Sequence, residues 1–350
     1  MTGANNSSRR RREPLTDAQL LMTISICIFA AMYIAAMIFR GGGFLKAQQI
    51  FDILNDNAAL IIIACALTIV MIGGGINISV GGVIGLTVMS CAIFLNAHTG
   101  GFSIVLSALL ALGIGLGFGL LEGFLVSYLE IQPFIVTLAG MFLSRGLTTM
   151  LSVNPVKVAH EGFQNLVKAK IKIPWLGYIA QNGNLIPAKL EIGAVVALCV
   201  VLLVYLMLRY MRFGRNIYAL GGNRQSALML GINIKSTCFW SYVLSGLLAG
   251  LAGLVFIMHK PAGNASVAMR SEMDAIAASI IGGTLLTGGV GNVIGTFFGV
   301  MILATIQKII ALSPLNASWW QEMASGAMLG FFIILQSVVL SNRAKRKKAS

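Results

Sequence analysis

Polar side chains that could bind a solute or carry charge stand inside long apolar runs of this 350-residue sequence. Arg145 lies in the middle of one run, where a guanidinium group must find hydrogen-bond acceptors or water. Asn77 and Ser79 follow three consecutive glycines, and either side chain can cap the helix that begins there. Asn292 lies in a second glycine-rich stretch. Because polar groups are costly in apolar surroundings, these four residues are candidates for function.

The sequence contains none of the motifs that mark common catalytic or metal sites. His-Glu-x-x-His, Gly-x-Ser-x-Gly and the Walker A motif are absent, and the dipeptide Gly-Lys does not occur. The five cysteines include no Cys-x-x-Cys pair, and the three histidines are far apart. We therefore expect a chain that is not an enzyme, holds no metal and binds no cofactor of its own.

The composition indicates a membrane protein. Hydrophobic residues make up 57% of the chain and charged residues 10%, against about a quarter charged in soluble domains. No Asp, Glu, Lys or Arg occurs from 57 to 121, a run far longer than the roughly 20 residues that span a bilayer. Such runs exclude a soluble enzyme, a disordered protein and a secreted disulfide scaffold.

The predicted fold is an all-α polytopic membrane protein with about ten transmembrane helices. Apolar runs of this length without strand-like alternation favour helices over a barrel. The expected spans are about 20–39, 52–72, 79–97, 102–121, 133–153, 190–209, 237–258, 272–287, 290–311 and 319–341.

Two glycine-rich segments interrupt this pattern. The first, near 73–82, predicts a broken helix, and its glycines are Gly73, Gly74, Gly75, Gly81 and Gly82. A possible second break lies at 282–295, where the string 289–295 matches 79–85 at five of seven positions. Paired interrupted segments often mark the substrate path of a transporter, although glycine-rich sequences also match by accident.

The glycines of the fourth predicted span are spaced for close helix packing. They form GxxxG pairs at 113/117, 115/119 and 119/123. Such pairs let two helix backbones approach closely, and we interpret them as packing sites without a direct role in function.

The charge distribution predicts the orientation of the chain. The tails 1–19 and 342–350 are basic, and basic segments beside membrane helices mark the cytoplasmic side. An even number of spans places both tails there. The transmembrane domain is then 20–341, with a cytoplasmic loop at 210–236 and an outward loop at 154–189. A nucleic-acid patch is the alternative for the tails, but no folded polar domain accompanies them, and we expect no nucleic-acid partner.

Acidic residues stand at the ends of the predicted spans. Glu122 ends the fourth span, and Glu272 and Asp274 begin the eighth. An ion-coupled secondary carrier normally needs acidic groups near the middle of the membrane. The position of the acidic residues at the span ends therefore argues against an ion-coupled carrier. Such a carrier, for a small polar solute, stays the alternative function.

Four strings together resemble the permease subunits of bacterial ABC sugar importers of the ribose, arabinose, xylose and galactofuranose type. They lie at 74–81 (GGINISVG), 137–146 (TLAGMF and RG), 213–232 (FGRN, ALGGN, A and GI) and 274–296 (DAIA, IGGT, GGVG and GT). The resemblance covers about residues 20–340. The pair Trp319-Trp320 looks most like the galactofuranose branch.

This resemblance implies a multi-pass permease in the bacterial inner membrane that imports a monosaccharide. Its partners would be an ATP-binding ABC subunit that hydrolyses ATP, a periplasmic sugar-binding protein and a second permease subunit, identical or paralogous. Asn77, Ser79, Arg145 and Asn292 would line or support the pathway through the lipid bilayer.

The resemblance also implies a coupling role for the loop 210–236. In it, Ala227 and Gly231 match the Ala and Gly of the motif that docks on the ATPase, and Arg215 and Asn223 are assigned to the same coupling segment. One departure concerns the first break, because Asn77 stands where the family commonly has Asp. Asn keeps the ability to cap a helix or to bond a sugar hydroxyl, but it loses the charge.

Overall fold

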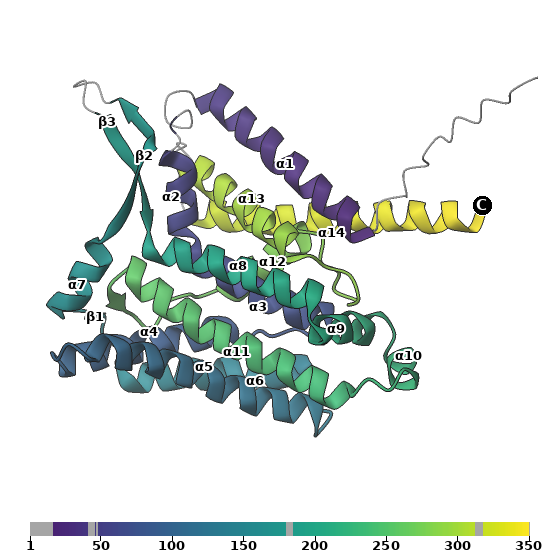
Figure 1. Ribbon diagram of the computed structural model, residues 1–350, viewed down its shortest axis with the longest axis horizontal. Helices are drawn as coiled ribbons and strands as arrows, with labels where there is room; N and C mark the ends of the chain where they lie inside the picture. Colours follow the sequence, from purple (N-terminus) through teal and green to yellow (C-terminus); the bar gives the residue numbers. More distant parts are fainter. Residues whose placement is uncertain (1–16, 41–45, 47, 180–184, 312–317, 350) are drawn as a thin grey trace, which may run out of the picture.

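The computed structural model describes residues 17–40, 46, 48–179, 185–311 and 318–349, most of them in helices (Figure 1). The helices are α1 (Asp17–Arg40), α2 (Gln48–Asp56), α3 (Ala58–Ile72), α4 (Val80–Ala97), α5 (Ser103–Ser127), α6 (Pro133–Leu151), α7 (Glu161–Lys168), α8 (Ile192–Tyr210), α9 (Arg212–Gly222), α10 (Arg224–Met229), α11 (Ile234–His259), α12 (Ser271–Ile281), α13 (Val293–Ala311) and α14 (Ser318–Ala349). The strands are β1 (Val156–Lys157), β2 (Lys170–Ile179), β3 (Leu185–Glu191) and β4 (Ala262–Gly263), paired antiparallel as β1–β4 and β2–β3.

The predicted all-α polytopic fold is confirmed, but the described helices give fewer spans than ten. Seven are long and apolar enough to cross a membrane: α1, α4, α5, α6, α8, α11 and α13. An eighth is formed by α2 and α3 if the pair, bent by 59° at Asn57, counts as one span. Helix α12 has 11 residues and is too short to cross alone. Part of the last expected span, 319–341, lies outside the residues whose side chains are described.

The elements that carry the two predicted loops lie at opposite ends of the molecule. Helices α9 and α10 are at one end, together with the start of α1 and the end of α14 (Figure 1). Helix α7 and the base of the β2–β3 hairpin are at the other end (Figure 1). The start of α1 and the end of α14 thus lie at the same end as α9 and α10, and the side of the membrane that this end faces stays a prediction.

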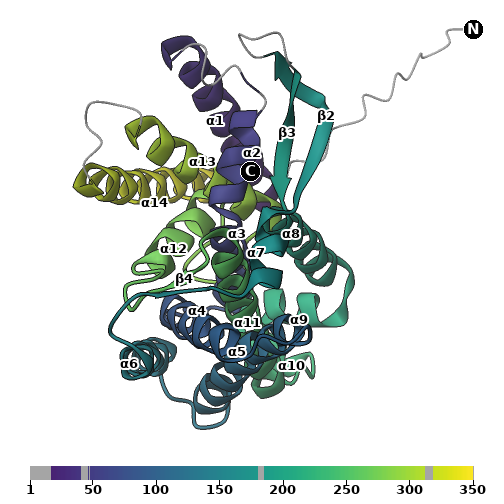
Figure 2. The ribbon, with the colours of Figure 1, turned by 90° about the vertical axis from the view of Figure 1, so that its left-hand side faces the viewer.

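Helix α3 forms the centre of the core. Figure 2 shows it between a group containing α4, α5, α6 and α11 and a group containing α1, α13 and α14. Thirteen of its 15 residues are buried, as expected for a helix that is apolar on every face. Its one hydroxyl in the core, Thr68 Oγ1, lies 2.7 Å from Thr296 Oγ1 and 3.2 Å from Ser279 Oγ. These contacts tie α3 to α12 and α13.

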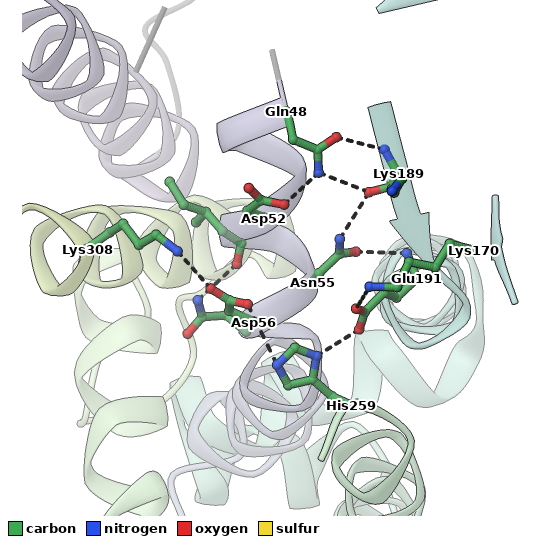
Figure 3. A network of polar contacts seen from close by, with 11 residues as sticks. Gln48, Asp52, Asn55, Asp56, Lys170, Lys189, Glu191, His259 and Lys308 are labelled. Atoms are coloured by element: carbon green, nitrogen blue, oxygen red, sulfur yellow. Dashed lines mark hydrogen bonds and ion pairs between the residues drawn. The ribbon is translucent and has the colours of Figure 1, made fainter. Parts of the chain in front are cut away.

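A polar network joins α2, β3, α11 and α13 at the hairpin end (Figure 3). Glu191 accepts a hydrogen bond from Lys170 Nζ at 2.8 Å and lies 2.7 Å from His259 Nδ1. Asp56 accepts from Lys308 Nζ at 3.1 Å and lies 3.6 Å from His259 Nε2. Partial burial acts to raise the pKa of Glu191, but the contacts with His259 and Lys170 outweigh it and hold that pKa below its usual value.

Glycines set the contact between α5 and α11. A Cβ at Gly115 would overlap Gly246 O, and a Cβ at Gly119 would lie 2.9 Å from Tyr242 O. By contrast, a Cβ at Gly113 or Gly117 would meet nothing within 4 Å. The predicted GxxxG pairs therefore have different surroundings: 115/119 and 119/123 face α11, whereas 113/117 does not.

We expect Gly115→Val to destabilise the protein and Gly117→Val to be tolerated. Both variants add the same side chain to the same helix, but only the first forces two backbones apart. Overpacking of this kind costs about 1–3 kcal/mol, which corresponds to a fall of several degrees in Tm. The measurement is the thermal midpoint of the monodisperse fraction in detergent. Equal midpoints for the two variants would contradict the α5–α11 contact.

Candidate functional site

The first predicted break is present between α3 and α4, but it covers only 73–79, because Gly81 and Gly82 lie inside α4. Helix α3 ends because Gly74 takes a φ of +85°, a left-handed conformation that favours glycine. The Gly74 N–H donates to Met71 O at 2.9 Å, and the Gly75 N–H donates to Val70 O at 3.0 Å. Asn77 then starts α4, because its Oδ1 accepts from Ser79 N at 3.0 Å and from Ser79 Oγ at 2.8 Å. Of the two capping candidates, Asn77 supplies the bond.

The second predicted break is also present and repeats the first. Helix α12 ends at Ile281, and Gly283 takes a φ of +94°. The Gly283 N–H donates to Ile280 O and the Thr284 N–H donates to Ser279 O, both at 2.9 Å. At the start of α13, Asn292 Oδ1 accepts from Ile294 N at 2.9 Å. The two breaks thus share a local design, but not in the register of the related strings: the strings are offset by 210 residues, whereas Asn77 and Asn292 are 215 residues apart.

The two breaks meet each other and the end of α9. The Gly289 N–H donates to Ile72 O at 2.8 Å, which satisfies an end carbonyl of α3. A Cβ at Gly288 would lie 2.9 Å from Gly74 Cα, and a Cβ at Gly289 would lie 2.7 Å from Gly222 Cα. Only glycine fits at these contacts. The end of α9 therefore touches both breaks through its backbone, and Tyr218 OH of α9 also donates to Gly291 O in the second break at 2.8 Å.

A buried polar cluster surrounds the first break. Asn77 and Ser79 are at most 1% exposed, and Asn77 Nδ2 donates to Ser245 Oγ on α11 at 3.1 Å. Beside them lies the carboxyl group of Glu122, which is 1% exposed and has no hydrogen-bond partner of good geometry among the described residues. The expectation that Glu122 ends its span is wrong: α5 continues to Ser127, and the carboxyl group is inside the protein. The sequence signal was its position beside the five GxxxG-spaced glycines of 113–123.

Arg145 lies apart from this cluster and binds a loop. Its Nη1 donates to Val267 O at 2.6 Å, and its Nη2 donates to Ala268 O at 2.9 Å. The loop that accepts these bonds is strained, because Ala268 and Arg270 have φ values of 53° and 67°. Arg145 thus fastens α6 to the segment that leads into α12.

Asn292 lies in a third place, near α1 and α9. Its Nδ2 contacts Met22 Sδ at 3.1 Å, and it lines a cavity of about 450 Å³ together with Arg215 and Tyr218. The structure therefore brings Asn77 and Ser79 together but places Arg145 and Asn292 elsewhere. Their role along a substrate path stays a prediction.

Helix α10 forms an exposed tip with fixed ends. Asn223 Oδ1 caps it by accepting from Ser226 N at 3.0 Å, and Gly231 ends it with a φ of +75°. Ala227 is buried, and Arg215 on α9 is exposed. The apolar side chains of Leu228, Met229 and Leu230 are 57%, 88% and 76% exposed. An exposed apolar group of this kind indicates a surface for another protein. The sequence signal for it was three large apolar residues in a basic loop.

Comparison with known proteins gives one family over most of the chain. Residues 49–334 match the family model described as branched-chain amino acid transport system / permease component. The inner membrane ABC transporter permease protein YjfF of Escherichia coli is 39% identical over 93% of this chain and 94% of its own length. The fructose import permease protein FruG of Bifidobacterium longum is 32% identical over 95% of both chains. The xylose transport system permease protein XylH of Escherichia coli is 28% identical over 93% of this chain and 94% of its own.

We expect Arg145→Met to loosen the loop 264–270. The change removes the donors for two loop carbonyls, and hydrogen bonds to charged groups contribute about 1.5–3 kcal/mol each. Trypsin should then cut after the exposed Arg270 at least several times faster, as read by mass spectrometry of the fragments. Arg209→Met, at an exposed position on α8, is the control and should leave this rate unchanged. An unchanged rate in Arg145→Met would contradict the fastening role.

Proposed function

Because the chain belongs to the family of permease components described as branched-chain amino acid transport system / permease component, we propose that it is the membrane-spanning permease subunit of an ATP-driven importer of a monosaccharide. The names of two relatives, a fructose and a xylose permease, support a sugar as cargo. The cargo class would be a pentose or a galactofuranose-like sugar, although none of the three relatives named above is called a galactofuranose permease.

The observation that carries the proposal is the continuous backbone connection from the exposed tip to the two breaks. Asn223 is both the residue after α9 and the cap of α10, so no flexible linker separates the two helices. At its other end, this backbone connection consists of the contact of Gly221 and Gly222 with Ile72 and Gly289. Binding of an ATPase to α10 would therefore displace both breaks together, which is what alternating access requires.

The proposal extends to the assembly, for which the exposed tip is the supporting observation. An ATP-binding subunit would cover the exposed side chains of Leu228, Met229 and Leu230, and the arginines of α9 and α10 would surround that contact. A sugar-binding protein would approach the opposite end, and a second permease subunit would complete the pathway. The chain would lie in the bacterial inner membrane with both tails on the cytoplasmic side, and the partner would hydrolyse ATP.

We expect uptake of a labelled sugar by cells to require both this gene and ATP. Cells that express the complete gene cluster, with and without this gene, are tested with labelled fructose, xylose, ribose, arabinose and galactose. Uptake should survive collapse of the proton gradient while ATP is maintained, and it should stop when ATP is depleted. Uptake that stops with the gradient despite normal ATP would favour the ion-coupled carrier, for which the buried Glu122 is the specific observation.

Gly231→Val should uncouple transport from the ATPase. A φ of +75° is strained for a β-branched residue by roughly 1–2 kcal/mol, so the end of α10 must rearrange. We expect normal insertion in the membrane, at least a tenfold loss of uptake, and loss of transport-stimulated ATP hydrolysis.

Gly117→Val provides the matched control for this variant. It adds the same side chain outside the coupling segment, and a Cβ at Gly117 meets nothing within 4 Å. Uptake should stay within twofold of the unmodified protein. Full stimulation of the ATPase by Gly231→Val would contradict the assigned role of α10.

A further inference from the structure

A cavity of about 360 Å³ lies beside the first break, and neither the proposed pathway nor the coupling contact explains it. Its walls come from Gly73–Gly75, the turn between α5 and α6, the end of α9 and the start of α11. This volume is within the range of small-molecule sites. The cavity is thus formed by the elements whose relative position must change during coupling.

Two buried hydroxyl groups in the wall lack a partner of good geometry. Ser127 is 4% exposed and Tyr242 is 1% exposed, and both line the cavity. Neither Ser127 Oγ nor Tyr242 OH has such a hydrogen-bond partner among the described residues, and the thiol of Cys238 beside Ser127 is only a weak donor. Buried polar groups are almost always paired, because a buried hydroxyl without a partner loses the hydrogen bonds that it makes in water. These two groups indicate a polar occupant.

The remaining wall matches a neutral ligand with several hydroxyl groups. Further hydroxyls and amides come from Ser241, Thr287, Gln132 and Asn223. Two basic side chains also line the cavity, but one of them, Lys235, forms an ion pair with Glu130 at 3.4 Å. The remaining arginine, Arg224, is exposed at the mouth rather than buried. Such a wall suits a neutral sugar better than an anion, whose charge would require buried cations.

We propose that this cavity is a regulatory site for a neutral monosaccharide, reached from the end of the molecule that carries α9 and α10. A bound sugar would contact the first break, the end of α9 and the start of α11 at once, and it would favour the arrangement in which all three are close. Ligands shift a conformational equilibrium by their difference in affinity for the two states. The site would therefore let accumulated sugar slow its own import; that the ligand is the cargo rests on the proposed function.

Cys238 lies in the cavity wall and allows a test that does not depend on transport. The full-length protein is prepared in lipid nanodiscs with the two exposed cysteines replaced, as Cys27→Ser and Cys199→Ser. The other two cysteines, Cys65 and Cys91, are fully buried. The rate at which N-ethylmaleimide modifies Cys238 is measured with D-fructose, D-xylose, D-galactose, inorganic phosphate or betaine at equal osmolality.

We expect at least one sugar to slow the modification threefold or more, with a saturable dependence on concentration, and betaine to have no effect. Ser127→Ala and Tyr242→Phe remove the two hydroxyls without adding volume, so they should abolish this protection. Thr149→Val, which changes an exposed hydroxyl on α6, should retain it. When no sugar is present, these variants should react within twofold of the rate of the unsubstituted protein, which shows that the fold is kept.

Absence of protection by every sugar would overturn the proposal, and so would stronger protection by inorganic phosphate. Protection that persists in both Ser127→Ala and Tyr242→Phe would also overturn it. The labelling rate requires neither ATP nor a partner, so this test is independent of the proposed function. If the proposed function is wrong, cells will show ATP-independent uptake or no uptake.

Discussion

Every backbone donor and acceptor inside an apolar protein must be paired, and the two helix breaks satisfy this requirement for each other. A helix that stops inside the core leaves carbonyl groups without partners. Ile72 O at the end of α3 receives its bond from Gly289, which belongs to the other break. The pairs α3–α4 and α12–α13 therefore form one unit. Without the other break, neither would have its backbone donors and acceptors paired in the same way.

The close backbone contacts at this junction have a mechanical consequence. Segments 72–75, 221–222 and 288–289 meet with no room for a Cβ at several positions, so the contacts there are made largely between backbone atoms. Because interiors are close-packed, such contacts transmit a displacement rather than absorb it. Helix α10 is capped at both ends and joined to α9 by the single residue Asn223. A force on the exposed tip would therefore reach the breaks as a rigid-body movement.

Sequence patterns predict the local features of this fold well and the tertiary ones poorly. The start of α6 falls at Pro133 as expected, and both breaks occur where glycines are consecutive, because these signals act within a few residues. The contact face of α5 depends on α11, whose glycines lie more than 100 residues away, so the sequence alone could not separate Gly115 from Gly117. The acceptors of Arg145 are likewise loop carbonyls 122 and 123 residues later. The span count differs because α12 ends at a break after 11 residues and because part of 319–341 lies outside the residues whose side chains are described.

The buried cluster at the first break gives a physical reason for Asn at position 77. The carboxyl group of Glu122 already lies beside this residue, close enough to Gly140 that a Cβ there would overlap it. An Asp at position 77 would place a second carboxyl group next to the first, with no ion pair to either among the described residues, and like charges in a buried site repel strongly. It would also lose the donor that bonds Ser245. Asn keeps both bonds to Ser79 and avoids the repulsion.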